Sequence, residues 1–490
     1  MTPSALSAGS SRQAPALWRV LGPVVLATGG AVVLNLLRPG ALTDDSYAFL
    51  DWGRDLRHGY LPLLEHRTFH PLPIVAGALV SLLGSAAPTV TVLLALAGLV
   101  LLALAAWRVV EILGFAQPAP ALAALLVLSS PLLSLLAQVA YINLPFATLL
   151  LWALVFELEG RPTAAWVLLV TAGLVRPEGW AFLLASGGFV GGRGGRPRAP
   201  RSWLALAALS LGPMALWLLL EWRLFGDPLY SFTSTRAPNV QATGSGSVSG
   251  LWSSLQFGVV RAPLVAAAVG AVAVARLAPR RVAATVLGMT AVAVFTILVL
   301  ASSKFNVPSR QFSALVPLLY ILAAAGAAAP ARVLEQRGMA SPRTRAATAA
   351  AGVALVAGLS VAPTINLLRH NFRTVRVAHG LRGTLDQALA RSARFLDVRG
   401  AQRHSVAMVG AVDDSQVVWG LGVPYDVVTD GVGPQTRMIV EPSESLYSRL
   451  GPIGLTDRTR LLPPSRWRLL LATGDWRIWV LGRRTPVRLR

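Results

Sequence analysis

The 490-residue sequence contains no cysteine. The protein therefore forms no disulfide bond and offers no thiolate to a metal, and the redox state of its compartment cannot be read from the sequence. Lysine is almost absent as well, because Lys304 is the single lysine among 44 basic residues. Charged residues make up only 13% of the chain, whereas hydrophobic residues make up 54%. A chain so poor in charge is best understood from its apolar segments.

Apolar runs of about twenty residues recur between residues 17 and 367. A transmembrane helix needs about 20 such residues, so these runs predict an α-helical polytopic membrane protein. The first run, at 17–37, is followed by no small-residue cleavage site leading into a soluble domain. We therefore expect it to be a retained helix and not a removed signal peptide. The run at 70–84 is too short for a comfortable span and is expected to form a surface or half-inserted helix.

The net charge of +22 could suit nucleic acid, yet most arginines before the C-terminal tail lie in short loops between the apolar runs. Such loops face the cytoplasm. Placing loops 191–201, 276–281 and 332–345 inside predicts about eleven helices, with the N-terminus cytoplasmic and the C-terminus outside. This count requires Arg176–Gly179 to separate two short spans, since one kinked helix would invert every later segment. We expect a multi-pass protein of the cell membrane, with membrane lipids and no nucleic acid as partners.

The composition becomes that of an ordinary soluble protein after about residue 370. We therefore divide the chain into a transmembrane domain at 1–368 and a small extracytoplasmic α/β domain at 369–490. Within the second domain, Val406–Gly410 is predicted as a strand, and Trp467–Ala472 with Arg477–Gly482 as a β-hairpin.

The polar residues of the transmembrane domain concentrate between Asp44 and Pro73, outside the membrane in the predicted orientation. Thr43 can cap a helix whose first turn carries two acids. Apolar and acidic positions then recur at helical spacing, with one face formed by Phe49, Trp52 and Leu56 and the opposite, solvated face by Asp51 and Asp55. This pattern predicts an amphipathic helix lying on the membrane surface.

Asp44 and Asp45 are the first candidates for catalysis. Adjacent carboxylates can split their pKa values, so that one stays ionised as a general base or a metal ligand. The alternative is an N-cap region in which the helix dipole favours both acids. Their position at the outer face, followed by His66, Arg67 and His70, favours the catalytic interpretation.

Other ionisable residues in the apolar region suggest a binding site. Arg176 and Glu178 interrupt an apolar helix, where such residues usually face a cavity; the alternative is a local pair that satisfies the broken backbone. Lys304 and Arg310 flank a short outer loop, and two cations there suit a lipid phosphate, although they could instead reach lipid headgroups. The acids Asp413-Asp414 follow an expected strand, and we interpret them as ordinary loop residues.

Several short motifs follow the acid pair in a characteristic order along residues 20–330. They are His70-Pro71-Leu72-Pro73, Leu82-Leu83-Gly84, Leu174 to Gly179 (LVRPEG), Gly226 to Ser231 (GDPLYS), and Ser309-Arg310-Gln311-Phe312 followed by Pro317. Together they resemble the GT-C superfamily of membrane glycosyltransferases, in particular the protein mannosyltransferase and aminoarabinose transferase types. Two positions depart from the family pattern: His70 stands where lysine is common, and Asn143 where relatives often place a second acid.

This resemblance implies an inverting transferase that moves a sugar from a polyprenyl-phosphate donor to a hydroxyl of a glycan, lipid or protein at the outer face of the membrane. The acid pair would supply the base, with Asp44 favoured and Asp45 as helper or ligand. Cations would stabilise the leaving phosphate. The implied substrate-binding residues are His66, Arg67, His70, Arg176, Glu178, Lys304 and Arg310. No cofactor is assigned, and a divalent cation is left open, with Asp45 as a candidate ligand.

Two other classes of protein remain open. A transporter or lipid-glycan flippase could use Arg176 and Glu178 as a midplane site in a broken helix. Against it, the sequence shows no inverted repeat, and its richest polar loop is expected outside the bilayer. A non-catalytic envelope scaffold could instead bind a partner through its C-terminal domain.

Overall fold

A computed structural model of the protein describes most of the chain in segments. These are residues 16–37, 39–59, 69–192, 200–234, 248–302 and 309–393, followed by five strands at 406–408, 428–429, 438–442, 467–472 and 476–481.

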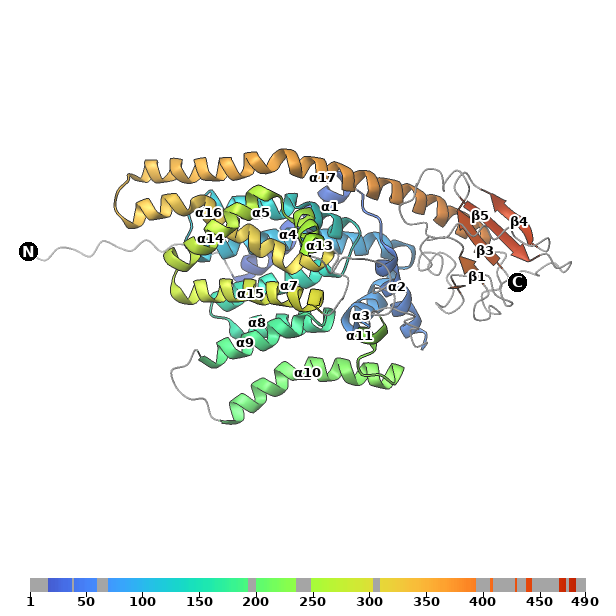
Figure 1. Ribbon diagram of the computed structural model, residues 1–490. Helices are drawn as coiled ribbons and strands as arrows, with labels where there is room; N and C mark the ends of the chain where they lie inside the picture. Colours follow the sequence, from blue (N-terminus) through green and yellow to red (C-terminus); the bar gives the residue numbers. More distant parts are fainter. Residues whose placement is uncertain are drawn as a thin grey trace, which may run out of the picture.

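Helices joined by short connections form most of the described structure (Figure 1). The first half contains α1 (Ala16–Leu37), α2 (Asp44–Arg57), α3 (Pro71–Val80), the 3-10 helix η1 (Ser81–Ala86), α4 (Ala87–Ile112), α5 (Ala119–Ser129), α6 (Pro131–Gln138), α7 (Asn143–Leu158), α8 (Pro162–Val175) and α9 (Gly179–Gly192). The second half contains α10 (Pro200–Phe225), α11 (Tyr230–Ser234), α13 (Val248–Gly258), α14 (Arg261–Leu277), α15 (Arg280–Ser302), the 3-10 helix η2 (Ser309–Ala314), α16 (Leu315–Gln336) and α17 (Pro342–Ala393).

The core of the bundle lies around α16, which is buried along most of its length and packs against α14. Gly270 of α14 faces the Leu322 carbonyl of α16, and Gly326 of α16 faces the Ala266 carbonyl of α14. A Cβ atom at either glycine would collide with backbone of the other helix. Small residues thus let these two helices approach closely, as is common between membrane helices.

Four helical segments in the described part of the chain are long and apolar enough to cross a membrane: Pro71–Ile112, Arg280–Ser302, Ser309–Gln336 and Pro342–Arg373. Two bent pairs of helices, one bent by 53° at α5–α6 and one by 93° before α14, raise the number to six. Shorter apolar helices include α7 and α8. A polytopic helical membrane protein is thereby confirmed, whereas the count of about eleven spans stays a prediction.

The interruption at Arg176–Gly179 separates two helices that lie side by side, as Figure 1 shows for α8 and α9. Arg176 is extended, with φ −148° and ψ 137°, as expected for a residue before proline. Gly179 then packs against the backbone at Gly173. The two-helix interpretation is correct, and the alternative of one kinked helix is excluded.

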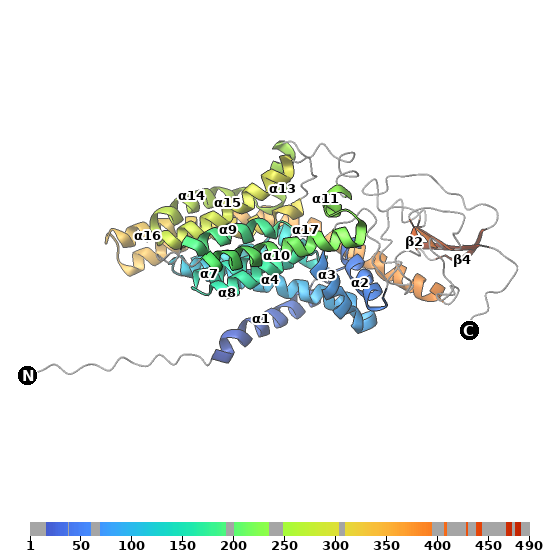
Figure 2. The ribbon, with the colours of Figure 1, turned by 90° about the horizontal axis from the view of Figure 1, so that it is seen from below.

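The two ends of the bundle carry different segments. In Figures 1 and 2, α2, α3 and α11 lie at the end nearest the C-terminal strands, while the turns from α14 to α15 and from α16 to α17 lie at the opposite end. The arginine-rich segments 276–281 and 332–345 are therefore far from the acid pair at the start of α2. This separation agrees with the predicted orientation, which itself stays a prediction.

The predicted solvated face of α2 is a correction. Asp51 and Asp55 are buried, whereas Leu56 is exposed. The reason is that α3 packs directly on α2: Gly53 lies against the backbone of Gly77 and Ala78. Arg54 forms an ion pair with Asp51, at 3.2 Å between Nη2 and Oδ1. α2 is therefore held between protein surfaces and does not lie on the membrane as a simple amphipathic helix.

The C-terminal strands form one mixed sheet of order β2-β1-β3-β5-β4. The sequence predicted β1 (Val406–Met408) and the antiparallel pair β4 (Trp467–Ala472) and β5 (Trp476–Leu481), but it missed β2 (Val428–Thr429) and β3 (Met438–Pro442). β1 pairs in parallel with both missed strands. Helix α17 runs without interruption past residue 369, so the proposed domain boundary falls within a helix. Asp413-Asp414 and the expected hairpin turn at 473–475 lie outside the described residues.

Candidate active site

The start of α2 is fastened to the turn between α6 and α7. The hydroxyl of Ser46 donates to the carbonyl of Val139 at 2.8 Å, and the Ala41 amide donates to the Gln138 carbonyl at 3.0 Å. Thr43 occupies the N-cap position as predicted, but its hydroxyl bonds to Ser46 Oγ and makes no cap bond to the helix backbone. These contacts hold the first turn of α2, and with it the acid pair, at the connection between α6 and α7.

Asp45 forms an ion pair with Arg310 of η2. Arg310 Nη1 donates to Asp45 Oδ2 at 3.0 Å and to the hydroxyl oxygen of Tyr141 at 3.1 Å. The guanidinium also lies over the Tyr141 ring, 5.1 Å from its centre. Both charged side chains keep about two fifths of their surface exposed, 42% for Asp45 and 39% for Arg310. They are therefore positioned by each other and still accessible to a ligand.

Tyr141 supports this pair as a neutral phenol. Burial, followed by the negative charge of Asp45, raises the pKa of Tyr141 above its ordinary value. The phenol therefore keeps its proton at neutral pH and accepts the hydrogen bond from Arg310 through an oxygen lone pair.

Arg176 is the centre of a second set of contacts. Its Nε and Nη2 donate to the two carboxylate oxygens of Glu178 at 3.2 and 2.6 Å. Its Nη1 donates to Asn143 Oδ1 at 2.9 Å, and its Nη2 also donates to Gln311 Oε1 at 2.8 Å. Burial alone would raise the pKa of Glu178, but the charge and hydrogen bonds of Arg176 lower it below its ordinary value. Glu178 is thus an ionised carboxylate that neutralises a buried guanidinium.

Asn143 joins the two sets of contacts, because its Nδ2 donates to the backbone carbonyl of Arg310 at 2.9 Å. We call the connected residues the polar network; its members are Asp45, Tyr141, Asn143, Arg176, Glu178, Arg310 and Gln311. They come from the start of α2, the α6–α7 connection with the start of α7, the α8–α9 break and η2. Segments up to 265 positions apart in the sequence therefore meet at one place.

His70 lies beside the polar network, immediately before α3. It is buried, and its ring contacts Phe49 and Trp217 edge to face. Its Nδ1 is 2.9 Å from the carbonyl oxygen of Val175. Burial, followed by the nearby positive charge of Arg176, lowers the pKa of His70 to about 3. A pKa this low keeps the imidazole neutral at ordinary pH, unlike the lysine that is common at this position in the resembled family.

The partner of His70 also decides its tautomer. A carbonyl oxygen can only accept a hydrogen bond, so Nδ1 must carry the proton and Nε2 a lone pair. His70 can therefore accept a hydrogen bond through Nε2, for example from a hydroxyl, but it cannot supply the positive charge of the lysine that is common in the resembled family.

Several predicted residues cannot be placed relative to the polar network. His66, Arg67 and Lys304 lie outside the described residues, and Asp44 is the first residue of α2 with a side chain that is likewise not described. Within the described ranges no three His, Asp or Glu side chains lie together in a way that could hold a metal ion. Because Asp45 already binds Arg310, we derive no chemical step through a metal, and a divalent cation stays a prediction without a described ligand set.

A cavity lies beside the polar network and shares Arg176, Glu178 and Gln311 with it. It contains about 320 Å³ of empty space, and Arg176, Glu178 and Gln311 line its polar wall. Most of the other lining residues are apolar, such as Phe146 of α7, Phe182 of α9 and Ile297 of α15. A ligand that places a polar group at Arg176 would therefore meet a hydrocarbon surface next to it.

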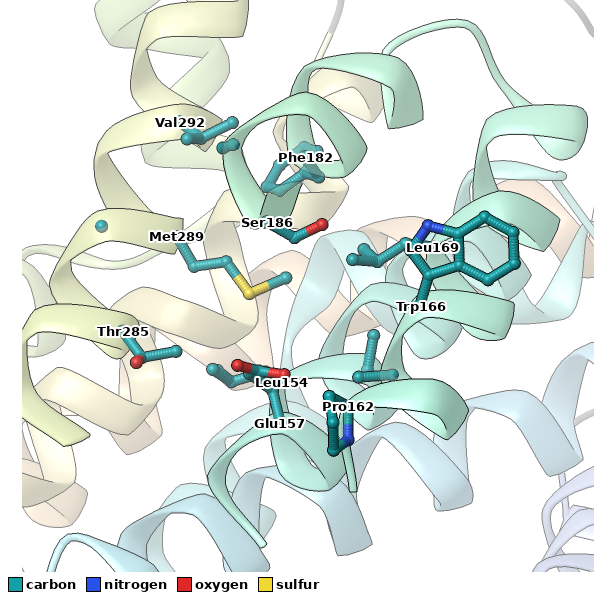
Figure 3. A pocket seen from close by; sticks show the side chains of 14 residues that line it. Leu154, Glu157, Pro162, Trp166, Leu169, Phe182, Ser186, Thr285, Met289 and Val292 are labelled. Carbon is teal, nitrogen blue, oxygen red and sulfur yellow. The ribbon is translucent and has the colours of Figure 1, made fainter. Parts of the chain in front are cut away.

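A larger cavity of about 550 Å³ continues along the same helices and shares Phe182 with the first. Figure 3 shows its lining side chains, which come from α7, α8, α9 and α15. Most are apolar, such as Leu169 and Met289, and Glu157 is the charged residue among them. The cavity residues of α15 follow helical spacing from Thr285 to Leu300, so one face of this helix borders both cavities.

Comparisons with known proteins rest on the fold. No family model matches the sequence, and no curated protein matches it. The structure of ArnT from Cupriavidus metallidurans bound to undecaprenyl phosphate matches with a TM-score of 0.58 and 16% identity, covering 95% of this chain and 98% of that chain. The chain has the ArnT fold. The apo state of ArnT matches similarly, with a TM-score of 0.55 and coverage of 94% and 98%.

The ArnT fold agrees with the fold that the motif resemblance implies. Because the likeness covers nearly the whole of both chains, it includes the helices that carry the polar network. At 16% identity this likeness shows the fold alone. What the site can do chemically depends on its own residues.

Sequence reasoning missed Gln311 as part of the site. Gln311 had appeared only as one letter of the Ser309–Phe312 motif, and a glutamine carries no charge that would mark it. Asn143 had been noted only for replacing an acid, yet it contacts both Arg176 and the backbone of Arg310. The available signal was position. Gln311 directly follows the predicted site residue Arg310, and Asn143 stands at the start of a helix.

Proposed function

We propose that the protein is a membrane glycosyltransferase of the GT-C type, which moves a sugar from a polyprenyl-phosphate donor to a hydroxyl of a cell-envelope acceptor. The observation that carries this proposal is the meeting of Asp45 with Arg310 at one end of a bundle that has the ArnT fold. The ArnT structure holds undecaprenyl phosphate, a lipid phosphate of the donor class that we propose.

The acid pair supplies the general base in this proposal. A carboxylate, for which we favour Asp44, removes the proton from the acceptor hydroxyl while its oxygen attacks the anomeric carbon. The bond between that carbon and the phosphate oxygen breaks, and the polyprenyl phosphate leaves with the electron pair. Attack opposite to the leaving group inverts the anomeric configuration. Asp45, held by Arg310, acts beside the base as its helper.

Positive charge is needed where the leaving phosphate becomes more negative. Arg310 suits this role because its guanidinium is partly exposed next to Asp45. Arg176 is less available, since Glu178, Asn143 and Gln311 already accept its hydrogen bonds. We therefore assign Arg310, together with Lys304 from the adjoining loop, to the phosphate, and Arg176 to holding the polar network in shape. His70 is left as a neutral hydrogen-bond acceptor.

The two apolar cavities beside α15 suit the hydrocarbon chain of such a donor. Ligand pockets are usually apolar with a few placed polar groups. Here most of the lining is apolar, and Arg176 and Glu178 stand in the wall of the smaller cavity. A transporter with a midplane site loses its main argument, because Arg176 and Glu178 belong to the same network as the acid pair at one end of the bundle.

The test is transfer by the purified protein in membrane vesicles, using a set of radiolabelled polyprenyl-phosphate sugars. Wild-type protein should release polyprenyl phosphate and label an acceptor, and Asp44→Asn should not. The anomeric configuration of the product, read by NMR, tests inversion separately. Equal release by wild type and by an Asp44→Asn, Asp45→Asn double variant would reject the proposed chemistry.

A further inference from the structure

Helix α10 carries a single acidic residue, Glu221, and its side chain is fully buried. One carboxylate oxygen accepts hydrogen bonds from Trp217 Nε1 at 2.8 Å and from the Ser231 amide at 3.3 Å, and it also accepts a short one from the Ser231 hydroxyl. A fully buried carboxylate is costly unless hydrogen-bond donors satisfy it, and here three donors do so. The role of Glu221 therefore depends on the residues that Trp217 and Ser231 contact in turn.

Ser231 connects Glu221 to Phe69, the residue before His70. Its hydroxyl donates to Glu221 and accepts from the backbone amide of Phe69 at 2.8 Å. A hydroxyl has one proton to donate, so this direction fixes the bond to Phe69 as one that Ser231 accepts. The result is a chain of hydrogen bonds from the Phe69 backbone to a buried carboxylate on another helix.

Trp217 reaches His70 from the other side. Its ring lies edge to face with the His70 imidazole, 5.7 Å between centres, and also contacts the rings of Phe69 and Trp180. The indole cannot turn freely, because its N–H is bound to Glu221. Glu221 therefore controls two things at once: the backbone leading into His70 and the ring that packs against its side chain.

We propose that Glu221, Ser231 and Trp217, which we call the α10 clamp, are positioning residues that fix His70 beside the polar network. Held in this way, the imidazole keeps its Nδ1–H directed at the Val175 carbonyl and presents Nε2 as an acceptor. The proposal also gives a role to the Gly226–Ser231 motif, whose last residue makes the connection. The catalytic use of the clamp rests on the proposed function, whereas the hydrogen bonds and ring contacts that form the clamp do not.

A purely structural role for the clamp is the competing explanation. In Figure 1, α10 lies at the edge of the bundle, next to α9 and apart from α16. If the clamp only attached α10 to the rest, its loss would lower thermal stability without a selective effect on His70. The two explanations therefore differ in the state of one imidazole in folded protein.

Chemical modification of histidine by diethyl pyrocarbonate separates them. In the full-length protein His70 should react slowly, while the exposed His58 reacts quickly and serves as the internal reference. Ser231→Ala removes one oxygen atom and should make His70 react several-fold faster, with the rate of His58 unchanged. Glu221→Ala should do the same, whereas Glu221→Gln, which keeps an acceptor oxygen for Trp217 and Ser231, should restore slow reaction.

Thr233→Ala is the matched control, since Thr233 is exposed on the same short helix and bonds within its own turn and to Asp227. It should leave His70 protected. The proposal is rejected if His70 stays protected in Ser231→Ala, or if Thr233→Ala deprotects it equally. It is also rejected if Ser231→Ala is too unstable to be purified folded, because the hydroxyl would then serve stability.

Kinetics connect the clamp to the proposed function. In Ser231→Ala we expect kcat to fall by about one to two decades, the scale of a misplacement of about 1 Å. The kcat of Glu221→Gln should be higher than that of Glu221→Ala. If the wild type transfers no sugar at all, the proposed function fails, while the modification rates still decide whether the clamp fixes His70. If transfer occurs but Ser231→Ala is fully active despite a deprotected His70, the clamp has no role in catalysis.

Discussion

Arg310 binds Asp45 across 265 positions of sequence, with 3.0 Å between Nη1 and Oδ2, and the same nitrogen reaches the Tyr141 hydroxyl. The pair joins a predicted phosphate ligand directly to the predicted acid pair. The two side chains therefore act as one unit, and changing either should disturb the other.

Arg310→Ala should lower the transfer rate by about two to three decades, as does loss of a preorganised donor at developing charge. Arg310→Lys keeps the charge but cannot hold Asp45 and Tyr141 with a planar fork, so we expect only partial activity. Because the residues touch, the effects of Arg310→Ala and Asp45→Asn should not add. Additive effects measured in the double variant would show that the pair has no joint role. Arg332→Ala, at the opposite end of the bundle, is the control.

The acid pair can be tested residue by residue. Asp44→Asn should lower the rate by about two to four decades if Asp44 is the general base, whereas loss of a charge in the first helical turn costs only about 0.3–1 kcal/mol of stability. The measurement is the transfer rate at equal amounts of folded protein. A fully active Asp44→Asn with an inactive Asp45→Asn would move the base by one residue and keep the mechanism.

The control for that experiment follows from the structure. Asp51 and Asp55 on the same helix are buried and paired with Arg54, so substitutions there would confuse folding with catalysis. Asp227 is better suited, because its carboxylate bonds to Leu229 and Thr233 at the protein surface. Asp227→Asn should stay within a few-fold of the wild-type rate.

Much of this arrangement could be predicted from local sequence. Apolar runs and their arginine-rich connections identified the helices, and proline after Arg176 identified the break between α8 and α9. The sequence analysis also placed Asp45 and Arg310 on the same side of the membrane, and these two residues do meet. Local patterns sufficed because helix length and helix ends are local properties.

The pairings within the polar network could not be predicted, since they depend on tertiary contacts. Asp45 with Arg310, and Asn143 with Arg176, join residues that no short pattern connects. The face of α2 was assigned wrongly for a related reason: its acids look solvated until α3 covers them, and that contact depends on Gly53 meeting Gly77. Likewise, the charge of His70 depends on burial, which the motif alone does not contain.

The absence of native cysteine allows a direct test of orientation. His58→Cys, exposed after α2, should react with a membrane-impermeant maleimide in intact cells, and Ser341→Cys, exposed before α17, should react only after lysis. The expectation follows from the arginine-rich segment next to Ser341, which favours the cytoplasm. Labelling of Ser341→Cys in intact cells would invert the proposed topology.

The ion pair of Arg176 with Glu178 should matter chiefly for stability. Glu178→Ala leaves a buried guanidinium without its counter-charge, which costs about 3–5 kcal/mol when one partner of a buried pair is removed. Thermal unfolding in detergent measures the loss. An Arg176→Gln, Glu178→Gln double variant should recover part of it, because both charges are gone. Glu111→Gln, in an exposed pair with Arg108, should change stability by no more than about 1 kcal/mol.

His70 should make the protein less stable at acidic pH. In the folded state its pKa is lowered to about 3 by burial and by Arg176, below the ordinary value of 6.5. Between these two values the unfolded chain binds a proton on His70 and the folded chain does not, so protons favour unfolding. The contribution of the neutral His70 is therefore fully present above about pH 6.5 and is lost progressively as the pH falls towards 3.

The measurement is the midpoint of thermal unfolding between pH 7 and pH 4, compared between wild type and His70→Gln. Glutamine is uncharged at every pH and can still donate to the Val175 carbonyl, so its midpoint should fall less steeply with acid. Glu178 contributes in the same direction in both proteins, because its lowered pKa stabilises the folded state above the ordinary glutamate value. The difference between the two curves therefore isolates His70. Parallel curves would mean that His70 is protonated in the folded protein, and His70 would return to the cations available for the phosphate.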